Sequence, residues 1–199
     1  MAKPSWLQTT PSSGSGNANV TVGANKHTGR VARNGVLTFK AANVANVERT
    51  VIQAGKPEYV DVDDAASADK AGKVVTISGV SNSKKLTFSL GTGDLSVTLP
   101  SSYTANSVST SNGANISGDP GASSEFPFSI AITVPANTST TSKSRQIIVT
   151  DEAGHTDVCT LTSAAGDAYL NVQFGDIELD YTGTPVTISV ESNTNWTIE

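Results

Sequence analysis

The chain has 199 residues, of which 37% are hydrophobic and 16% are charged, and its net charge is −5. The length suggests one or two domains, and so few charged residues exclude the composition of an intrinsically disordered chain. The acidic balance, with no cluster of Lys and Arg beyond Arg30 and Arg33, excludes the basic face of a nucleic-acid-binding protein. The single cysteine, Cys159, excludes an intrachain disulfide.

Short apolar segments with a two-residue period recur along the whole chain. In chain order they lie at residues 19–22, 36–39, 74–77, 86–90, 128–134, 146–150 and 186–190. They are rich in β-branched residues, as strands are, and clusters of Gly, Asn, Asp, Ser and Pro between them are typical of turns. No window of ten or more residues has the apolar stripe of a helix. The pattern predicts an all-β protein built as a β-sandwich.

The sequence repeats with a period of about 110 residues. The recurring segments are VTVGAN at 20–25 with ITVPAN at 132–137, YVDV at 59–62 with YLNV at 169–172, and VTIS at 75–78 and again at 186–189. Their offsets are 112, 110 and 111 residues, and Arg33 falls on Arg145 at an offset of 112. Offsets that differ by one or two residues are what insertions and deletions in loops produce.

The repeat divides the chain into one complete copy and two halves. Residues 57–166 form the complete module, residues 1–56 correspond to the C-terminal half of a module, and residues 167–199 correspond to its N-terminal half. Half a sandwich exposes its apolar inner face, and a fragment this short cannot bury enough surface to stay folded by itself. We therefore expect residues 167–199 to pair with residues 1–56 of another subunit.

The two chain ends, read as one continuous module, contain a characteristic order of residues. Residues 186–199 (VTISVESNTNWTIE) lead into residues 3–17 (KPSWLQTTPSSGSGN), then 33–39 (RNGVLTF) and 50–55 (TVIQAG). The order comprises Ser-Asn-x-x-Trp, a second Trp followed by Leu, Pro-x-x-Gly, an Arg before a Thr-rich strand, and Val-x-Gln-x-Gly. Over 86 residues of the split copy it resembles a BACON domain, an immunoglobulin-like module common in Bacteroidetes proteins and their phages.

The middle copy departs from this pattern. It has Lys85-Leu86 near the first Trp position, no second Trp, SAAG at 163–166 in place of Gln-Ala-Gly, and an extra stretch at residues 91–125. The resemblance implies tandem immunoglobulin-like β-sandwiches and an extracellular, cell-surface or virion setting. BACON domains have also been proposed to bind carbohydrate or mucin glycans, so a glycan-binding adhesion module is the alternative function.

The split runs between two tryptophans that should share one core. The residues expected in the core of the split module, and so at the subunit interface, are Trp6, Leu7, Val20, Val22, Leu37, Phe39, Val51, Val172, Leu179, Val186, Ile188, Val190, Trp196 and Ile198. Three arrangements would cover them. One subunit completes the next by strand complementation, which builds a head-to-tail filament or ring; the two halves of one chain meet; or the chain is a fragment of a longer array of modules.

Closure within one chain is expected to be strained. Each half is linked to the middle copy by a joint of four residues, which reaches at most about 14 Å. A sandwich with its side chains is some 20 Å wide, because its sheets pack about 10 Å apart.

No constellation of residues predicts catalysis, a cofactor or a metal ion. The acidic cluster at residues 61–64 has Ala66 and Gly72 where an EF-hand loop needs Gly and Glu. His27 and His155 fall at unrelated positions of the repeat, and no Gly-x-Ser-x-Gly nucleophile elbow accompanies them. Cys159 lies in an apolar strand, where we expect it to pack in the core.

Few aromatic residues are available to bind a sugar. Tyr103, in the extra stretch, is the one aromatic side chain that could form an exposed platform for a glycan. No apolar run approaches the roughly 20 residues of a membrane span, and the N-terminus lacks the apolar run of a signal peptide. The sequence predicts a non-enzymatic structural protein of a filament or phage virion. Its expected partner is another copy of itself, with glycans as the alternative partner and with neither nucleic acid nor membrane insertion.

Overall fold

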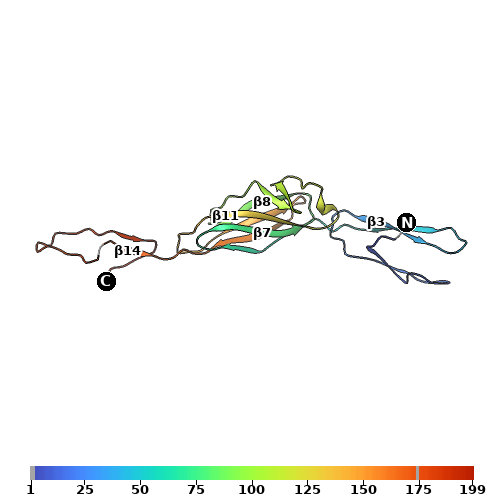
Figure 1. Ribbon diagram of the computed structural model, residues 1–199, viewed down its shortest axis with the longest axis horizontal. Coiled ribbons are helices and arrows are strands. Elements are labelled where there is room, and N and C mark those ends of the chain that lie inside the picture. Colours follow the sequence, from blue (N-terminus) through green and yellow to red (C-terminus); the bar gives the residue numbers. More distant parts are fainter. Residues whose placement is uncertain (1–2, 174) are drawn as a thin grey trace.

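The computed structural model describes residues 3–173 and 175–199. Its regular structure there is almost entirely strand, with one short 3-10 turn and no α-helix, which confirms the all-β prediction. Three segments follow one another along a single long axis (Figure 1): residues 3–56 at one end, residues 57–166 in the middle and residues 167–199 at the other end. No helix in the described part is long and apolar enough to cross a membrane.

The middle segment is a sandwich of two sheets. The first has the strand order β10-β9-β11-β7-β5 and the second has the order β6-β13-β12-β8. The strands are β5 (Val60–Val62), β6 (Ala65–Ala68), β7 (Lys73–Ser81), β8 (Leu86–Gly93), β9 (Ser102–Ala105), β10 (Val108–Ser111), β11 (Phe126–Val134), β12 (Lys143–Asp151) and β13 (Thr156–Ser163). Neighbouring strands are antiparallel except for β6 and β13, which are parallel.

One hydrophobic core fills the space between these sheets. Alternate residues of β11 are buried, namely Phe126, Phe128, Ile130, Ile132 and Val134. Ile147 and Val149 of β12 enter the same core from the second sheet. Burying each side chain of this kind contributes roughly 1.5–3 kcal/mol. Every member of the core lies between Val60 and Leu161, so the middle segment contains the whole of this core.

The extra stretch at residues 91–125 is built into the sandwich. Its strands β9 and β10 extend the first sheet beside β11, and it ends in a 3-10 turn, η1 (Pro120–Ala122). The side chain of Asn112 pairs with the backbone of β8: the Phe88 amide donates to Asn112 Oδ1 at 2.8 Å, and Asn112 Nδ2 donates to the Phe88 carbonyl at 3.0 Å. The stretch therefore belongs to the module itself.

Tyr103 is not an exposed platform for a glycan, and that prediction is wrong. It lies on β9, where alternate residues Tyr103 and Ala105 face the core. The Tyr103 side chain is only 3% exposed, and its ring centroid lies 4.9 Å from that of Phe88. A ring with no exposed face cannot stack on a sugar.

The N-terminal segment consists of two separate two-stranded sheets. β1 (Leu7–Thr10) pairs with β2 (Thr21–Ala24), and β3 (Arg33–Phe39) pairs with β4 (Val47–Gln53). Leu7 and Leu37 are its only buried hydrophobic residues among those described. Gly35 allows the two sheets to approach, since a Cβ atom there would lie 2.7 Å from Pro4 and 3.2 Å from Leu7.

The C-terminal segment is a single antiparallel strand pair with long extended stretches. β14 (Leu170–Val172) pairs with β15 (Val190–Ser192). None of its described hydrophobic residues is buried. Its large exposed hydrophobic residues are Tyr169, Leu170, Val172, Ile177, Leu179, Tyr181, Val186, Trp196 and Ile198.

Candidate subunit interface

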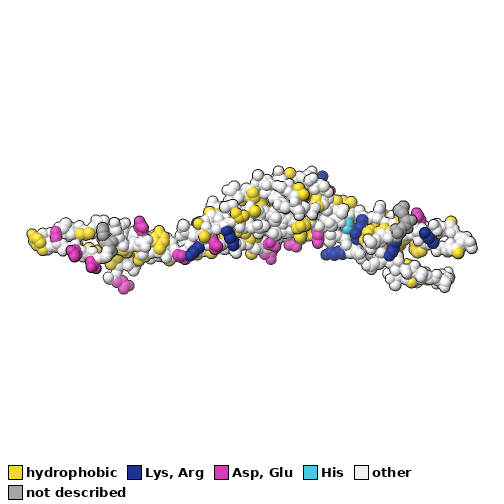
Figure 2. All heavy atoms as spheres, viewed as in Figure 1, with side chains coloured by type: hydrophobic (Ala, Val, Ile, Leu, Met, Phe, Trp, Pro, Cys, Tyr) yellow, Lys and Arg dark blue, Asp and Glu magenta, His cyan; other side chains and the backbone are white. Residues whose placement is uncertain are grey.

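The two end segments expose most of the residues that the sequence assigns to a split core. Leu7 and Leu37 are buried, whereas Trp6, Val51, Ile188 and Val190 are half-buried. The exposed members are Val20, Val22, Phe39, Val172, Leu179, Val186, Trp196 and Ile198. Figure 2 shows hydrophobic side chains on the surface at both ends of the molecule. The core residues of the N-terminal segment and those of the C-terminal segment do not meet within this chain, because the middle segment separates them (Figure 1).

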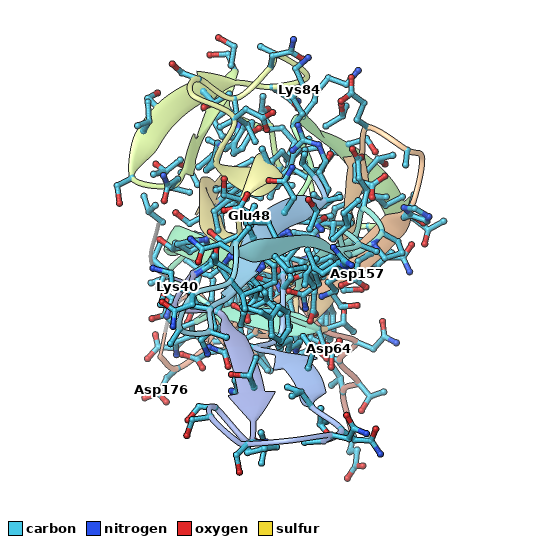
Figure 3. The ribbon with its side chains drawn as sticks, turned by 90° about the vertical axis from the view of Figure 1, so that its right-hand side faces the viewer. Lys40, Glu48, Asp64, Lys84, Asp157 and Asp176 are labelled. Carbon is cyan, nitrogen blue, oxygen red and sulfur yellow. The ribbon has the colours of Figure 1, made fainter. Side chains whose placement is uncertain are left out.

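An open groove lies between the two small sheets of the N-terminal segment. It has a volume of 620 Å³, and its lining includes Val20, Leu37, Phe39 and Pro11. Figure 3 looks along the long axis onto this end, where Lys40 lies at the end of β3 and also lines the groove. β2 pairs only with β1, and β3 only with β4, so each has an unpaired edge among the described residues. Unpaired strand edges beside a groove that contains Val20, Leu37 and Phe39 are suited to accept added strands.

The C-terminal strand pair repeats a strand pair of the middle module. Leu170 lies opposite Ser192 in the pair β14–β15, just as Val60 lies opposite Ser81 in the pair β5–β7. In the middle module β7 is also paired with β11 on its other side. β15 has no such second neighbour in the described chain. The C-terminal segment thus has the form of a sheet edge whose inner neighbour is missing.

Asn82 holds the joint between the N-terminal and middle segments. Its side chain is fully buried. The Nδ2 atom lies 3.2 Å from each of three carbonyl oxygens, those of Thr28, Lys56 and Pro57. The Oδ1 atom accepts a hydrogen bond from the Tyr59 amide at 3.0 Å. One side chain therefore ties together the N-terminal segment, the connecting peptide and the start of the middle module.

Asn193 makes the corresponding contacts at the second joint. Its Nδ2 atom donates to the carbonyl of Thr138 at 3.2 Å and to that of Asp167 at 2.9 Å. Its Oδ1 atom accepts a hydrogen bond from the Tyr169 amide at 3.0 Å. The sequence repeat therefore includes the connection between modules as well as the modules.

Arg30 also fastens the N-terminal segment to the middle module. Its guanidinium forms ion pairs with Glu58 and Asp119, and Nη1 donates to the Asn82 carbonyl at 3.1 Å. Its backbone amide donates to the Gly121 carbonyl at 2.9 Å. The hydrogen bond to Asp119 raises the pKa of Arg30. Asp119 and Gly121 belong to the extra stretch, which therefore also contributes to this joint.

The two end segments have opposite charges. Residues 3–56 contain seven Lys or Arg residues and a single acidic residue, Glu48, which gives a net charge of +6. Residues 167–199 contain six Asp or Glu residues and neither Lys nor Arg, which gives −6. Figure 2 shows this division along the long axis. The net charge of the whole chain does not show this opposition of charge between the two ends. Counting the charges of each segment separately would have predicted it from the sequence.

The reactive side chains of the middle module have structural partners. His155 Nδ1 lies 2.8 Å from Asp151 Oδ2, and Asp157 Oδ2 accepts a hydrogen bond from the Val62 amide at 2.7 Å. Burial raises the pKa of the Cys159 thiol to about 11, which keeps it protonated and unreactive. Within residues 3–173 and 175–199, no group of three His, Cys, Asp or Glu side chains could hold a metal ion.

The fold defines an all-β protein in which one β-sandwich lies between two end segments built of two-stranded sheets. No protein-family model matches the sequence, and no curated protein matches it significantly. The resemblance to BACON domains therefore rests on the residues of the split copy. Two of these residues are in contact, since the Arg33 guanidinium lies 4.5 Å from the centre of the Trp6 ring.

Proposed function

We propose that this protein is a non-enzymatic structural subunit that assembles head to tail. Residues 167–199 of one subunit complete residues 3–56 of the next. The observation that carries this proposal is the sequence repeat, which relates the two ends to complementary parts of the middle segment. By the repeat, β2, β3 and β4 correspond to β11, β12 and β13, while β14 and β15 correspond to β5 and β7.

Burial of apolar surface supplies the driving force for this assembly. Phe39 on the accepting end is 45% exposed, and Trp196 on the donating end is 46% exposed. Covering side chains of this size contributes up to roughly 1.5–3 kcal/mol each. Neither end segment has a core comparable to that of the middle module, so each gains stability from the other.

Charge favours the head-to-tail orientation. The +6 end of one subunit attracts the −6 end of another, whereas two like ends repel each other. The contact joins different surfaces on the two subunits, so it propagates into a filament, or into a ring if successive rotations close. Because the two ends lie at opposite poles of an elongated molecule (Figure 1), each added subunit leaves a free end for the next.

The resemblance to BACON domains supports an extracellular setting for such an assembly, on a cell surface or a phage virion. This setting is part of the proposal. The alternative function, glycan binding, loses its only candidate residue because Tyr103 is buried.

Sedimentation velocity combined with negative-stain electron microscopy tests the assembly. The full chain is expected to form polymers whose size increases with protein concentration. Val186→Asp places a charge in the donated apolar strand and is expected to abolish polymers, while the matched control Tyr181→Ser changes a fully exposed residue in a turn and leaves them intact. A wild-type chain that stays monomeric at all concentrations, or a Val186→Asp chain that polymerises as well as wild type, would contradict the proposal.

A further inference from the structure

On the premise of the head-to-tail assembly proposed above, we infer the strand register that joins two copies of this chain. Residues 184–187 of the donating copy lie antiparallel to residues 19–22 of the accepting copy, which include the first two residues of β2, with Val186 opposite Val20. Residues 196–198 lie antiparallel to β3, with Ile198 opposite Leu37. The C-terminal segment thus adds one strand to each small sheet of its partner.

The first contact follows from the pair β7–β11 of the middle module. Val75 of β7 lies opposite Ile132 of β11, and both are buried. The repeat equates Val75 with Val186 and Ile132 with Val20. Val186 and Val20 are both exposed in the single chain. Setting them opposite each other gives the two valines the apolar surroundings that their counterparts have.

The second contact follows from the pair β8–β12. Phe88 of β8 lies opposite Val149 of β12. The repeat equates Val149 with Leu37 at an offset of 112, and Phe88 with Ile198 at an offset of 110. Leu37 is already buried by its own segment, whereas Ile198 is 80% exposed. The donated strand would cover Ile198 against the groove that Leu37 lines.

The same register pairs two aromatic residues. Leu86 lies opposite Asp151 in the middle module, and the corresponding residues are Trp196 and Phe39. Aromatic residues directly opposite each other on neighbouring antiparallel strands stabilise the pairing of the two strands. The split module therefore has a Trp–Phe pair where the middle module has a Leu–Asp pair. The split module also lacks the extra stretch at residues 91–125 of the middle module.

The accepting edges are free and continuous with the groove. In the middle module β7 pairs with one edge of β11, and β8 pairs with one edge of β12. By the repeat, these two edges correspond to the unpaired edges of β2 and β3. The lining of the groove beside β3 includes Val20, Leu37 and Phe39, the residues that the register pairs with the donated strands. Slipping by one residue would turn every apolar side chain of a donated strand to solvent, so the register is strongly specified.

Pairs of introduced cysteines at positions between the core-facing ones test this register. Thr38→Cys with Thr197→Cys sets two thiols opposite each other across the contact with β3. The matched control, Thr38→Cys with Glu199→Cys, uses the same strand face two residues out of register. There the Cβ atoms are about 7–8 Å apart, which is too far for a disulfide.

A second set of cysteines tests the contact with β2. Asn19→Cys with Thr187→Cys is in register, because the corresponding residues Ala131 and Thr76 are opposite each other in the middle module. Asn19→Cys with Ser189→Cys is its shifted control. The native Cys159 can stay in place, since it is fully buried and its pKa is about 11.

The readout is non-reducing gel electrophoresis of oxidised, polymer-containing samples of the full chain. Both in-register pairs are expected to give ladders of covalent oligomers, at least tenfold more than the shifted pairs. Equal or greater cross-linking by a shifted pair, or no ladder from any pair in samples that sediment as polymers, would overturn the register and leave the assembly standing. Loss of the polymers themselves in the wild-type chain would instead overturn the assembly.

Discussion

Asn82 and Asn193, separated by 111 residues, make corresponding hydrogen bonds at two successive joints. Each side-chain oxygen accepts the amide of the residue that begins the next module, Tyr59 or Tyr169, at 3.0 Å. The serine before each asparagine donates to the carbonyl of the same tyrosine, at 2.7 and 2.9 Å respectively. A filament of such subunits would use this connection at every joint.

Replacing Asn82 by alanine is expected to weaken the joint strongly. The change leaves the Tyr59 amide and several carbonyl groups without their buried partner. Each unsatisfied buried group costs about 1–3 kcal/mol, so the free energy of unfolding should fall by about 2–4 kcal/mol in chemical denaturation. The matched variant Asn193→Ala alters a joint that is partly exposed and should cost less than about 1.5 kcal/mol in the monomer. An equal decrease in the free energy of unfolding of the two variants would show that burial of the Asn82 joint does not increase its contribution to stability.

Ionic strength is expected to control assembly. Salt screens the attraction between the +6 and −6 ends, because the Debye length falls from about 10 Å at 0.1 M to about 3 Å at 1 M. The protein concentration at which half of the subunits are polymerised should rise by roughly tenfold or more between about 0.05 M and 0.5 M sodium chloride. Sedimentation velocity at each salt concentration measures this midpoint. A midpoint that does not change with salt would rule out electrostatic pairing of the ends.

Tyr103 is expected to act as a core residue. Tyr103→Ala removes a buried ring that packs on Phe88 and should lower the free energy of unfolding by about 3–5 kcal/mol. Tyr103→Phe should change it by less than about 1 kcal/mol, because the Tyr103 hydroxyl is buried without a hydrogen-bond partner. Thermal or urea unfolding measures both values. An alanine variant as stable as wild type would contradict the packing seen here.

Asp180 should titrate at unusually low pH. Its carboxylate accepts hydrogen bonds from the hydroxyl and amide groups of Thr182 and Thr184, which lower its pKa from 3.8 to about 2. A lowered pKa means that the carboxylate stabilises this turn above about pH 4, and that this contribution is lost as the pH falls toward 2. NMR titration of the Asp180 carboxyl carbon measures the midpoint. Thr182→Val combined with Thr184→Val should return the midpoint toward 3.8, and a wild-type midpoint near 3.8 would contradict the turn geometry.

Local patterns in the sequence were sufficient to predict the all-β class and the long strands of the middle module, but residues 186–189, predicted as part of a strand, lie outside β15 (Val190–Ser192). Successive side chains of a strand point to opposite faces, so the alternation in residues 126–134 already separates the buried residues of β11 from the exposed ones. The repeat likewise identified the residues of both half-modules that carry apolar side chains. What the sequence alone determined is therefore which residues share a face and which segments correspond to one another.

Tertiary structure decided what covers each face and what meets at each joint. Alternation groups Tyr103 with Ala105, but only the packing of β9 beside β11 shows that their face is the buried one. Asn82 follows a strand as many turn residues do, and its role depends on Thr28, a residue 54 positions away that the fold brings within 3.2 Å. Contacts between residues distant in the chain depend on how whole sheets pack, and no short-range pattern encodes that packing.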